Sequence, residues 1–109
     1  MTKTAGRDPG KTKNGSDGTV KNTVCEVHVS NRLGLHARPA MMLVREASRF
    51  ASSITLRKDK TAADCRSILD LLTIAAPQGT TLQLVASGTD ADEAAAAISG
   101  MFDNKFGEE

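Results

Sequence analysis

The chain has no tryptophan, no tyrosine and only three phenylalanines among its 109 residues. Its core must therefore be built almost entirely from aliphatic side chains and alanine. Net charge is also small, at +1, with most of the positive excess in the first 23 residues. A near-neutral domain without aromatic residues interleaved among basic ones gives no support to nucleic-acid binding.

Cysteine is scarce as well, and Cys25 and Cys65 are the two thiols. Two cysteines make no disulfide framework, and neither belongs to a CxxC pair or to a Cys/His cluster. A metal site built on His28 and His36 would lack further ligands. We therefore expect free thiols, no metal and no cofactor.

Long apolar runs are missing. No stretch approaches the roughly 20 residues that span a bilayer, so membrane insertion is not expected. The first residues, MTKTAGRDPGKTKNGSDG, lack the apolar segment of a secretory signal. A cytoplasmic location is the expectation that follows.

The chain divides into two parts by composition. Residues 1–22 are rich in Gly, Lys, Thr, Asp and Asn and show no apolar periodicity. Such a segment cannot bury enough surface to offset the entropy lost on ordering, which predicts a disordered N-terminal extension. One folded domain is predicted over residues 23–109.

Within that domain, two periodicities alternate. Apolar residues at every second position predict strands over residues 24–30, 53–59, 61–65 and 80–87. Helical spacing predicts three helices, about 13 residues from Ala37, then 67–76 and 91–104. The second helix should bury Leu71, Ile74 and Ala75, and Asp90 with Glu93 resembles a capping box for the third.

The order is therefore β-α-β-β-α-β-α, with strands that face solvent on one side. This pattern predicts an α/β (α+β) domain, a two-layer open-faced β-sandwich whose four-stranded sheet carries all three helices on one face. Fold alone does not define function, so the motifs must carry that argument.

The segment GLHARP at residues 34–39 places His36 at or just before a helix N-terminus. Pro39 supports a helix start there, because proline is tolerated in the first turn. Free backbone N–H groups and the helix dipole favour an anion at this end. Histidine is a nucleophile near neutral pH, and Arg38 offers a guanidinium to phosphate oxygens. No second histidine, cysteine or carboxylate lies nearby in the sequence, so an inert surface histidine and a phosphoryl acceptor both remain open.

The segment CRSILDLLT contains a second candidate site. Ser67 stands at the N-cap position of the second helix, where its hydroxyl would stabilise the helix by about 1 kcal/mol. Ile68, Leu69 and Leu72 add more apolar surface than one core-facing stripe needs. The alternatives are a helix with a broad buried face and an exposed aliphatic patch for partner docking, of which we favour the patch.

The segment SNRLGLHARPA resembles the active-site segment of the HPr family, the histidine-containing phosphocarrier proteins of the phosphoenolpyruvate-dependent phosphotransferase system. The resemblance covers residues 23–109 and includes the element order, RSILDLLT and the ASG turn after the fourth strand. The NRLG approach and the ending MFDNKFGEE look closer to the nitrogen-related branch than to the sugar branch.

The resemblance implies a phosphoryl carrier that is not an enzyme in its own right. His36 matches the histidine that takes a phosphoryl group on Nδ1 from enzyme I, charged by phosphoenolpyruvate, and passes it to an enzyme IIA domain, in sugar transport or in nitrogen or carbon regulation. Arg38 matches the arginine that contacts the group, above the amides of Ala37 and Arg38. We expect a monomer.

Ser67 matches the serine that an ATP-dependent HPr kinase/phosphorylase modifies in many bacteria. The alternative function is therefore a regulatory binding protein of the same fold that acts through phosphorylation of Ser67 and the aliphatic patch. Two departures from the family pattern are the pair Asp59-Lys60 at the turn between the second and third strands and the charge of Asp70 near the patch.

Overall fold

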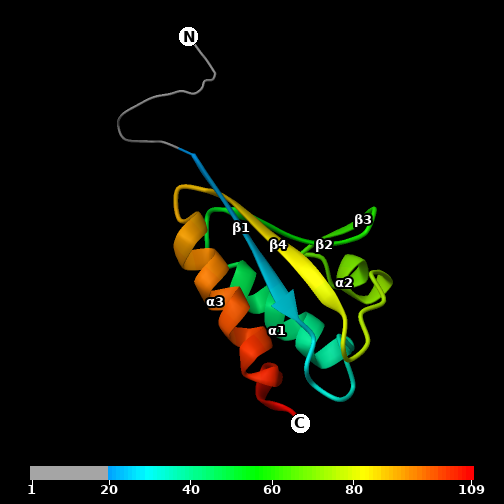
Figure 1. The fold of residues 1–109 in the computed structure, drawn as a ribbon. Coiled ribbons are helices and arrows are strands. Elements are labelled where there is room, and N and C mark those ends of the chain that lie inside the picture. The colour runs from blue at the N-terminus through cyan, green and yellow to red at the C-terminus, as the bar shows by residue number, and fades with distance from the viewer. Residues whose placement is uncertain (1–19) are drawn as a thin grey trace.

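The computed structural model describes residues 20–109, which form one sheet and the helices that cover it. The elements follow in the predicted order (Figure 1). Their bounds are β1 Lys21–His28, α1 Ala37–Ala47, β2 Ser53–Lys58, β3 Thr61–Asp64, α2 Ile68–Thr73, β4 Thr81–Gly88, α3 Ala91–Asp103 and the short 3-10 helix η1 Lys105–Gly107.

The sheet is fully antiparallel in the order β1-β4-β2-β3. Helix α3 packs on β1 and β4, α2 contacts β3, and α1 contacts both other helices. Figure 1 shows these helices on the same side of the sheet, with the other side left open. The predicted two-layer open-faced sandwich is confirmed.

The core lies between the sheet and the helices and is largely aliphatic, as composition required. Alternate residues of the strands point into it, including the fully buried Leu56, Leu82 and Leu84. Each such leucine contributes about 1.5–3 kcal/mol relative to an exposed position. Phe102 and Phe106 are also buried and pack edge to face, with ring centroids 4.9 Å apart. Both come from the C-terminal part of the chain, so they fix where that end lies.

The start of the domain differs slightly from the sequence-based boundary. Strand β1 begins at Lys21 and pairs with Gly88, two residues before the predicted start at Thr23. Lys21 and Thr23 both bind the Asp92 carboxylate, at 3.0 and 2.5 Å, which ties the first residues of the strand to α3. The predicted disorder of the extension otherwise concerns residues 1–19, which lie outside the described residues.

Helix α2 is shorter than predicted, and the prediction that Ala75 is buried was wrong. The helix ends at Thr73, and Ala75 takes a left-handed conformation with φ of 56° that turns its methyl group outward. The carbonyls beyond the helix bind other elements. Lys58 Nζ donates to the Ala75 oxygen at 2.5 Å, and the Leu35 N–H donates to the Ala76 oxygen at 2.9 Å. These contacts explain why helical periodicity failed past Ile74.

Helix α1 also ends early, at Ala47 rather than near Phe50. The side chain of Ser48 donates back to the Val44 carbonyl, and the Arg66 guanidinium donates to the carbonyls of Ala47, Phe50 and Ser52. A cation there satisfies carbonyls that the last turn of a helix leaves free.

The proposed capping box of α3 is not formed. Asp90 is the N-cap residue, but its side chain makes no capping bond. Its carboxylate instead accepts hydrogen bonds from the backbone N–H of Ala51 and Ser52 at 2.9 Å and from the Ser52 hydroxyl at 2.5 Å. Sequence spacing predicted a local hydrogen bond to the first turn of α3, whereas in the fold the donors come from the turn just before β2.

Candidate functional site

His36 is the N-cap residue of α1, as the sequence predicted. Its backbone is extended, with φ of −98° and ψ of −169°, and the helix begins at the next residue. The His36 side chain makes no capping hydrogen bond. Since the first N–H groups of a helix have no intrahelical carbonyl, those of Ala37 and Arg38 point out of the helix end. Pro39, in the third helical position, has no N–H to satisfy.

The loop before His36 depends on Gly34. This residue has φ of 72°, and a Cβ there would lie 2.7 Å from the Ala76 oxygen and 2.9 Å from the Pro77 Cα. Only glycine combines that conformation with so close an approach. The adjacent bond from Leu35 N–H to the Ala76 oxygen holds the loop against the segment that follows α2. The position of His36 is therefore set partly by the segment that follows α2.

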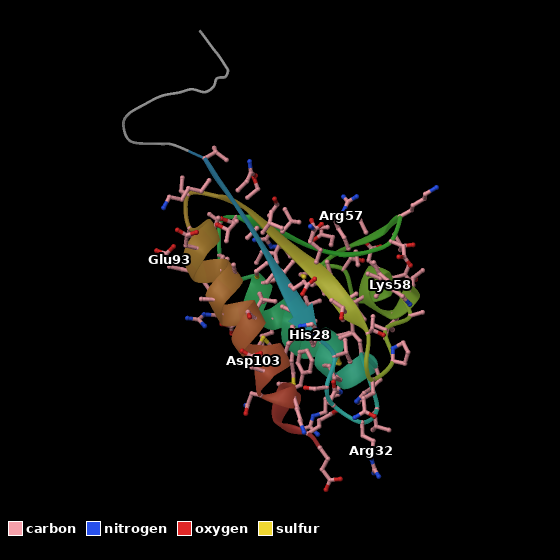
Figure 2. The ribbon with its side chains drawn as sticks, in the orientation of Figure 1. His28, Arg32, Arg57, Lys58, Glu93 and Asp103 are labelled. Carbon is pink, nitrogen blue, oxygen red and sulfur yellow. The ribbon has the colours of Figure 1, made fainter. Side chains whose placement is uncertain are left out.

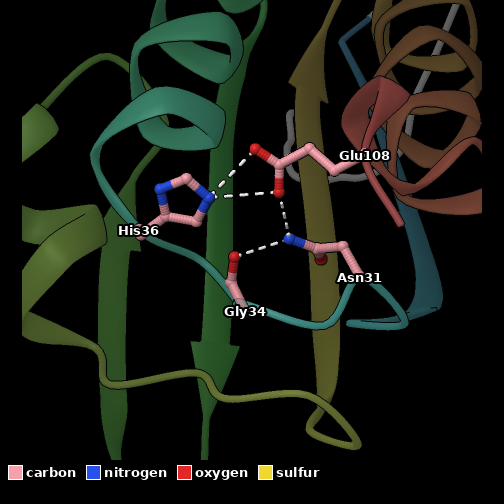
Figure 3. A network of polar contacts seen from close by, with 4 residues as sticks. All are labelled: Asn31, Gly34, His36 and Glu108. Carbon is pink, nitrogen blue, oxygen red and sulfur yellow. Dashed lines mark hydrogen bonds and ion pairs between the residues drawn. The ribbon is translucent and has the colours of Figure 1, made fainter.

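The ring of His36 faces the side chain of Glu108, near the C-terminus of the described chain (Figure 3). Nε2 lies 3.0 Å from Oε2 and 3.1 Å from Oε1 of Glu108. The His36 side chain is 33% exposed and that of Glu108 only 12%. Within the described residues Nδ1 of His36 has no hydrogen-bond partner, which leaves the other ring nitrogen open. The fold thus supplies a carboxylate that the local sequence lacked.

Asn31 holds this carboxylate in place. The residue is fully buried, and its Nδ2 donates to the Gly34 carbonyl at 2.7 Å and to Glu108 Oε1 at 3.0 Å (Figure 3). Both partners are acceptors, which assigns the amide nitrogen to this side of Asn31. Its Oδ1 is buried without a hydrogen-bond partner among the described residues. The buried amide therefore links the loop before His36 to the Glu108 carboxylate.

The Glu108 carboxyl is held as an anion. The hydrogen bond from His36 is the largest cause that lowers its pKa, and Asn31 and the charge of Arg38 act in the same direction. Partial desolvation opposes them. An ionised carboxylate accepts hydrogen bonds only, so the His36 nitrogen that faces it must carry the proton.

Arg38 lies on the exposed surface beside this network. It lines a shallow hollow of about 270 Å³ together with Arg32, Leu33, Gly107, Glu108 and Glu109. It also lines a second groove along α1 with Ala37, Met41, Met42 and Arg45. Figure 2 shows Arg32 at the end of the molecule where the chain terminates. The charge of Arg38 is thus close enough to Glu108 to lower the pKa of that carboxyl.

The predicted aliphatic patch is exposed. Ile68, Leu69 and Leu72 on α2 are 40%, 74% and 43% exposed, although this helix packs against α1 and β3. Leu33 and Met41, near His36, are exposed as well. Sequence analysis did not single out this second pair. A leucine in a polar loop and a methionine opposite the core face were the signals available.

Ser67 caps α2. Its Oγ accepts a hydrogen bond from the Asp70 N–H at 3.1 Å, as predicted for this position. Asp70 in turn accepts at Oδ2 from the Asp64 N–H, at 3.2 Å. The charge of Asp70 thus stabilises the turn before the helix. Two aspartates stand close to the serine hydroxyl.

The other chemical groups lie apart from His36. His28 is on the open face of the sheet, within 3.1 Å of Thr81 Oγ1, and Figure 2 shows it on β1. Among residues 20–109 no cluster of three or more His, Cys, Asp or Glu side chains could hold a metal. Both cysteines are free, and burial raises the pKa of the Cys65 thiol to about 12. None of the helices in this range has the length and apolarity to span a membrane.

A histidine at the open N-terminus of the first helix, in a four-stranded sheet with this order of helices, is the arrangement of a histidine phosphocarrier. Residues 24–104 match the family model described as "PTS HPr component phosphorylation site". The chain belongs to the HPr family and is a phosphocarrier of the phosphotransferase system rather than a catalytic enzyme.

Individual proteins similar to this chain are members of the same family. The phosphocarrier protein HPr of Treponema pallidum is 46% identical over 83 residues, which cover 76% of this chain and 94% of that protein. The phosphocarrier protein NPr of Escherichia coli K12 is 37% identical over 92 residues, 84% of this chain and 99% of that protein. A crystal structure of HPr-C-His from Thermoanaerobacter tengcongensis has a TM-score of 0.76 and 37% identity, covering 80% of this chain and 98% of the other.

Proposed function

We propose that Nδ1 of His36 accepts a phosphoryl group from enzyme I, charged by phosphoenolpyruvate, and passes it to an enzyme IIA domain. The single observation that carries this proposal is the state of the His36 ring. One nitrogen faces an ionised carboxylate, and the other, at the open N-terminus of α1, has no hydrogen-bond partner among residues 20–109. Relatives from the HPr and NPr groups support sugar transport and nitrogen or carbon regulation as the processes served.

Transfer onto His36 needs no proton movement at the attacking atom. The Nδ1 lone pair forms a bond to phosphorus while the donor's bond to phosphorus breaks, and that electron pair stays with the donor. The incoming group brings negative charge to the helix end. The N–H groups of Ala37 and Arg38 and the Arg38 guanidinium are the donors placed to neutralise it.

The same geometry suits a group that must be given up again. The His36 side chain is 33% exposed, so a phosphoryl group on it would stay accessible to the next protein in the transfer sequence. Since the acceptor protein supplies its own nucleophile, this chain needs no substrate pocket. We accordingly propose a carrier that acts in the cytoplasm as a monomer between two partners.

The exposed aliphatic patch on α2 is the proposed docking surface for enzyme I and enzyme IIA domains. Ile68, Leu69 and Leu72 would be covered on binding, and removal of their apolar surface from water would favour the complex. Leu69 is the most exposed of the three. Leu69→Ser is expected to raise the Kd for enzyme I about tenfold, measured by titration calorimetry. The exposed Val24→Ser, on the open face of the sheet, is the matched control.

Ser67 carries the second candidate function, regulation by phosphorylation. The observation that favours it is position, because the half-buried hydroxyl begins the helix that bears the patch. A phosphate there would add charge beside Asp64 and Asp70 and repel acidic partner surfaces. An HPr kinase/phosphorylase would be the third partner. Acid-stable phosphate on Ser67 after incubation with ATP and an extract of the source cells is the expected result, with Ser67→Ala as the blank.

The carrier function is tested by labelling. The protein is incubated with enzyme I and isotopically labelled phosphoenolpyruvate, and acid-labile phosphate is measured on wild type, His36→Ala and His28→Ala. Label is expected on wild type and on His28→Ala, and none on His36→Ala. Undiminished labelling of His36→Ala, or none on the wild type, would show that the proposal is wrong.

A further inference from the structure

The C-terminal residues are fixed against the loop that carries His36. Phe106 in η1 is 2% exposed and packs on Phe102 of α3. Beyond it, the Arg32 N–H donates to the Glu109 oxygen at 2.5 Å. Glu108 lies between these two attachments, so its backbone is held on both sides. Its carboxylate is thus positioned by the fold and not by chance contact on the surface.

Asn31 fixes the orientation of that carboxylate. With Nδ2 bridging the Gly34 carbonyl and Glu108 Oε1, the buried amide links the loop conformation to the carboxylate that faces the ring (Figure 3). Such an arrangement of carboxylate, histidine and an orienting neighbour sets which ring nitrogen bears hydrogen. The His36 ring is therefore constrained before any phosphoryl donor arrives.

We propose that Glu108, held by Asn31, is a positioning residue that keeps the proton on Nε2 of His36 and turns the Nδ1 lone pair towards the phosphoryl donor. This inference rests on the proposed function of His36. Glu108 touches neither the donor nor phosphorus and acts only through the imidazole.

The consequence extends to the phosphorylated state. When Nδ1 bonds to phosphorus and Nε2 keeps its proton, the ring becomes a cation, and its charge faces the Glu108 carboxylate. Loss of the Nε2 proton would leave a neutral ring, which is a poorer leaving group for the next transfer. Glu108 thus keeps the phosphoryl group labile over a wider pH range.

Other charged side chains line the hollow that Glu108 borders. Arg38 comes from α1, Arg32 from the loop after β1, and Glu109 from the chain end. Arg32 and Glu109 lie 4.0 Å apart with highly exposed side chains, so water screens them strongly. Glu108 is the carboxylate in direct contact with Nε2, and its removal should dominate the pH response.

The test uses the full chain and two readouts. First, nitrogen-15 NMR of the unphosphorylated imidazole at pH 8.5 reports which ring nitrogen is protonated, in wild type, Glu108→Ala and Glu108→Gln. We expect a single Nε2–H form in the wild type and a mixture in Glu108→Ala. This readout needs no phosphoryl donor, so it stands even if the proposed function fails.

Second, the protein is phosphorylated with phosphoramidate, a small donor that releases ammonia, and hydrolysis of the phosphohistidine is followed from pH 4 to 9. Glu108→Gln is expected to slow phosphorylation about tenfold. It should also move the midpoint of the hydrolysis profile down by about one pH unit, since a neighbouring carboxylate favours the cationic ring. Glu109→Gln removes the same charge one residue away and should match the wild type in both.

Asn31→Ala provides a second variant, expected to change the tautomer signal in the same direction but by less. Should it fail to fold, the Glu108 variants still decide. Unchanged nitrogen shifts in Glu108→Ala, or an equal shift of the hydrolysis midpoint in Glu108→Gln and Glu109→Gln, would overturn the assignment of Glu108. Labelling of His36 in all of these proteins would at the same time leave the carrier function standing.

Discussion

The N-termini of α1 and α2 are built in opposite ways. At α2, the Ser67 side chain accepts from the Asp70 N–H, so the helix satisfies its own first turn. At α1, His36 occupies the same position but turns its ring away to Glu108, and its side chain caps nothing. One terminus is closed by its own sequence, and the other is left open for an external anion.

This difference shows that an N-cap position alone does not make an anion site. Three features distinguish the N-terminus of α1. Its first N–H groups are not capped by the His36 side chain, Arg38 is adjacent, and the His36 ring is held by Glu108 near the C-terminus. Asp90 at α3 is a third case, since its carboxylate accepts hydrogen bonds from Ala51 and Ser52 in the turn before β2. Long-range contacts decide what each helix end can do.

The largest effect is expected when α1 is given the N-cap residue of α2. His36→Ser is expected to lose all acid-labile phosphate, because the hydroxyl can close the first turn but offers no ring nitrogen. Phosphoenolpyruvate-dependent labelling with enzyme I measures this. His28→Ser is the control, since His28 lies on the open face of the sheet and should leave labelling unchanged. Retained acid-labile label on His36→Ser would place the acceptor elsewhere.

Gly34→Ala should disturb the loop that positions His36 at the N-terminus of α1. A Cβ at φ of 72° would lie 2.7 Å from the Ala76 oxygen, so the loop must move or remain strained. We expect a loss of about 2–3 kcal/mol in the free energy of unfolding, measured by urea denaturation. Gly79→Ala is matched, because Gly79 also has positive φ, at 94°, but open space around its Cβ position. Equal losses in both variants would mean that backbone strain alone, without the contact to Ala76, explains the effect.

Much of this architecture could be predicted from the sequence. Alternation located every strand, and His36, Pro39 and Ser67 marked two helix starts that the structure contains. Predictions failed where chain segments distant in sequence supply the bonding partners. Ala75 is exposed and not buried, because Lys58 and Leu35 donate hydrogen bonds to the carbonyls of Ala75 and Ala76 and the helix does not continue.

The carboxylate beside His36 shows the same limit most clearly. Glu108 lies 72 residues from His36, and nothing in its local sequence indicates that contact. Asn31 did carry a signal, because it continues the inward alternation of Val27 and Val29. A polar residue in an inward position indicates a buried hydrogen bond even where its partner is unknown.

Ser67→Ala opens the closed terminus without creating a phosphoryl acceptor. Loss of the bond to the Asp70 N–H should lower the free energy of unfolding by about 1 kcal/mol, measured by urea denaturation. Ser67→Asp is the informative partner, since aspartate is also a good N-cap and should restore part of that stability. It places a charge beside the aliphatic patch, so weaker binding to enzyme I is expected despite the recovered stability. A stability of Ser67→Ala equal to wild type would show that the hydroxyl is not a cap in solution.

The smallest expected effect concerns the third helix end and appears only in acid. Hydrogen bonds from the Ser52 hydroxyl, and then from the Ala51 N–H, lower the pKa of the Asp90 carboxyl below its ordinary value of 3.8. A carboxyl whose pKa is lower in the folded state contributes stability above its unfolded pKa and loses it as the pH falls through the folded value. Asp90→Asn should therefore be less stable than wild type at pH 7, and the difference should shrink as the pH falls through the lowered pKa of the folded state. Urea denaturation at pH 7, 4 and 2.5 measures this, with the exposed Glu93→Gln as control. A difference that stays constant down to pH 2.5 would mean that the geometry of Asp90, and not its charge, holds the start of β2.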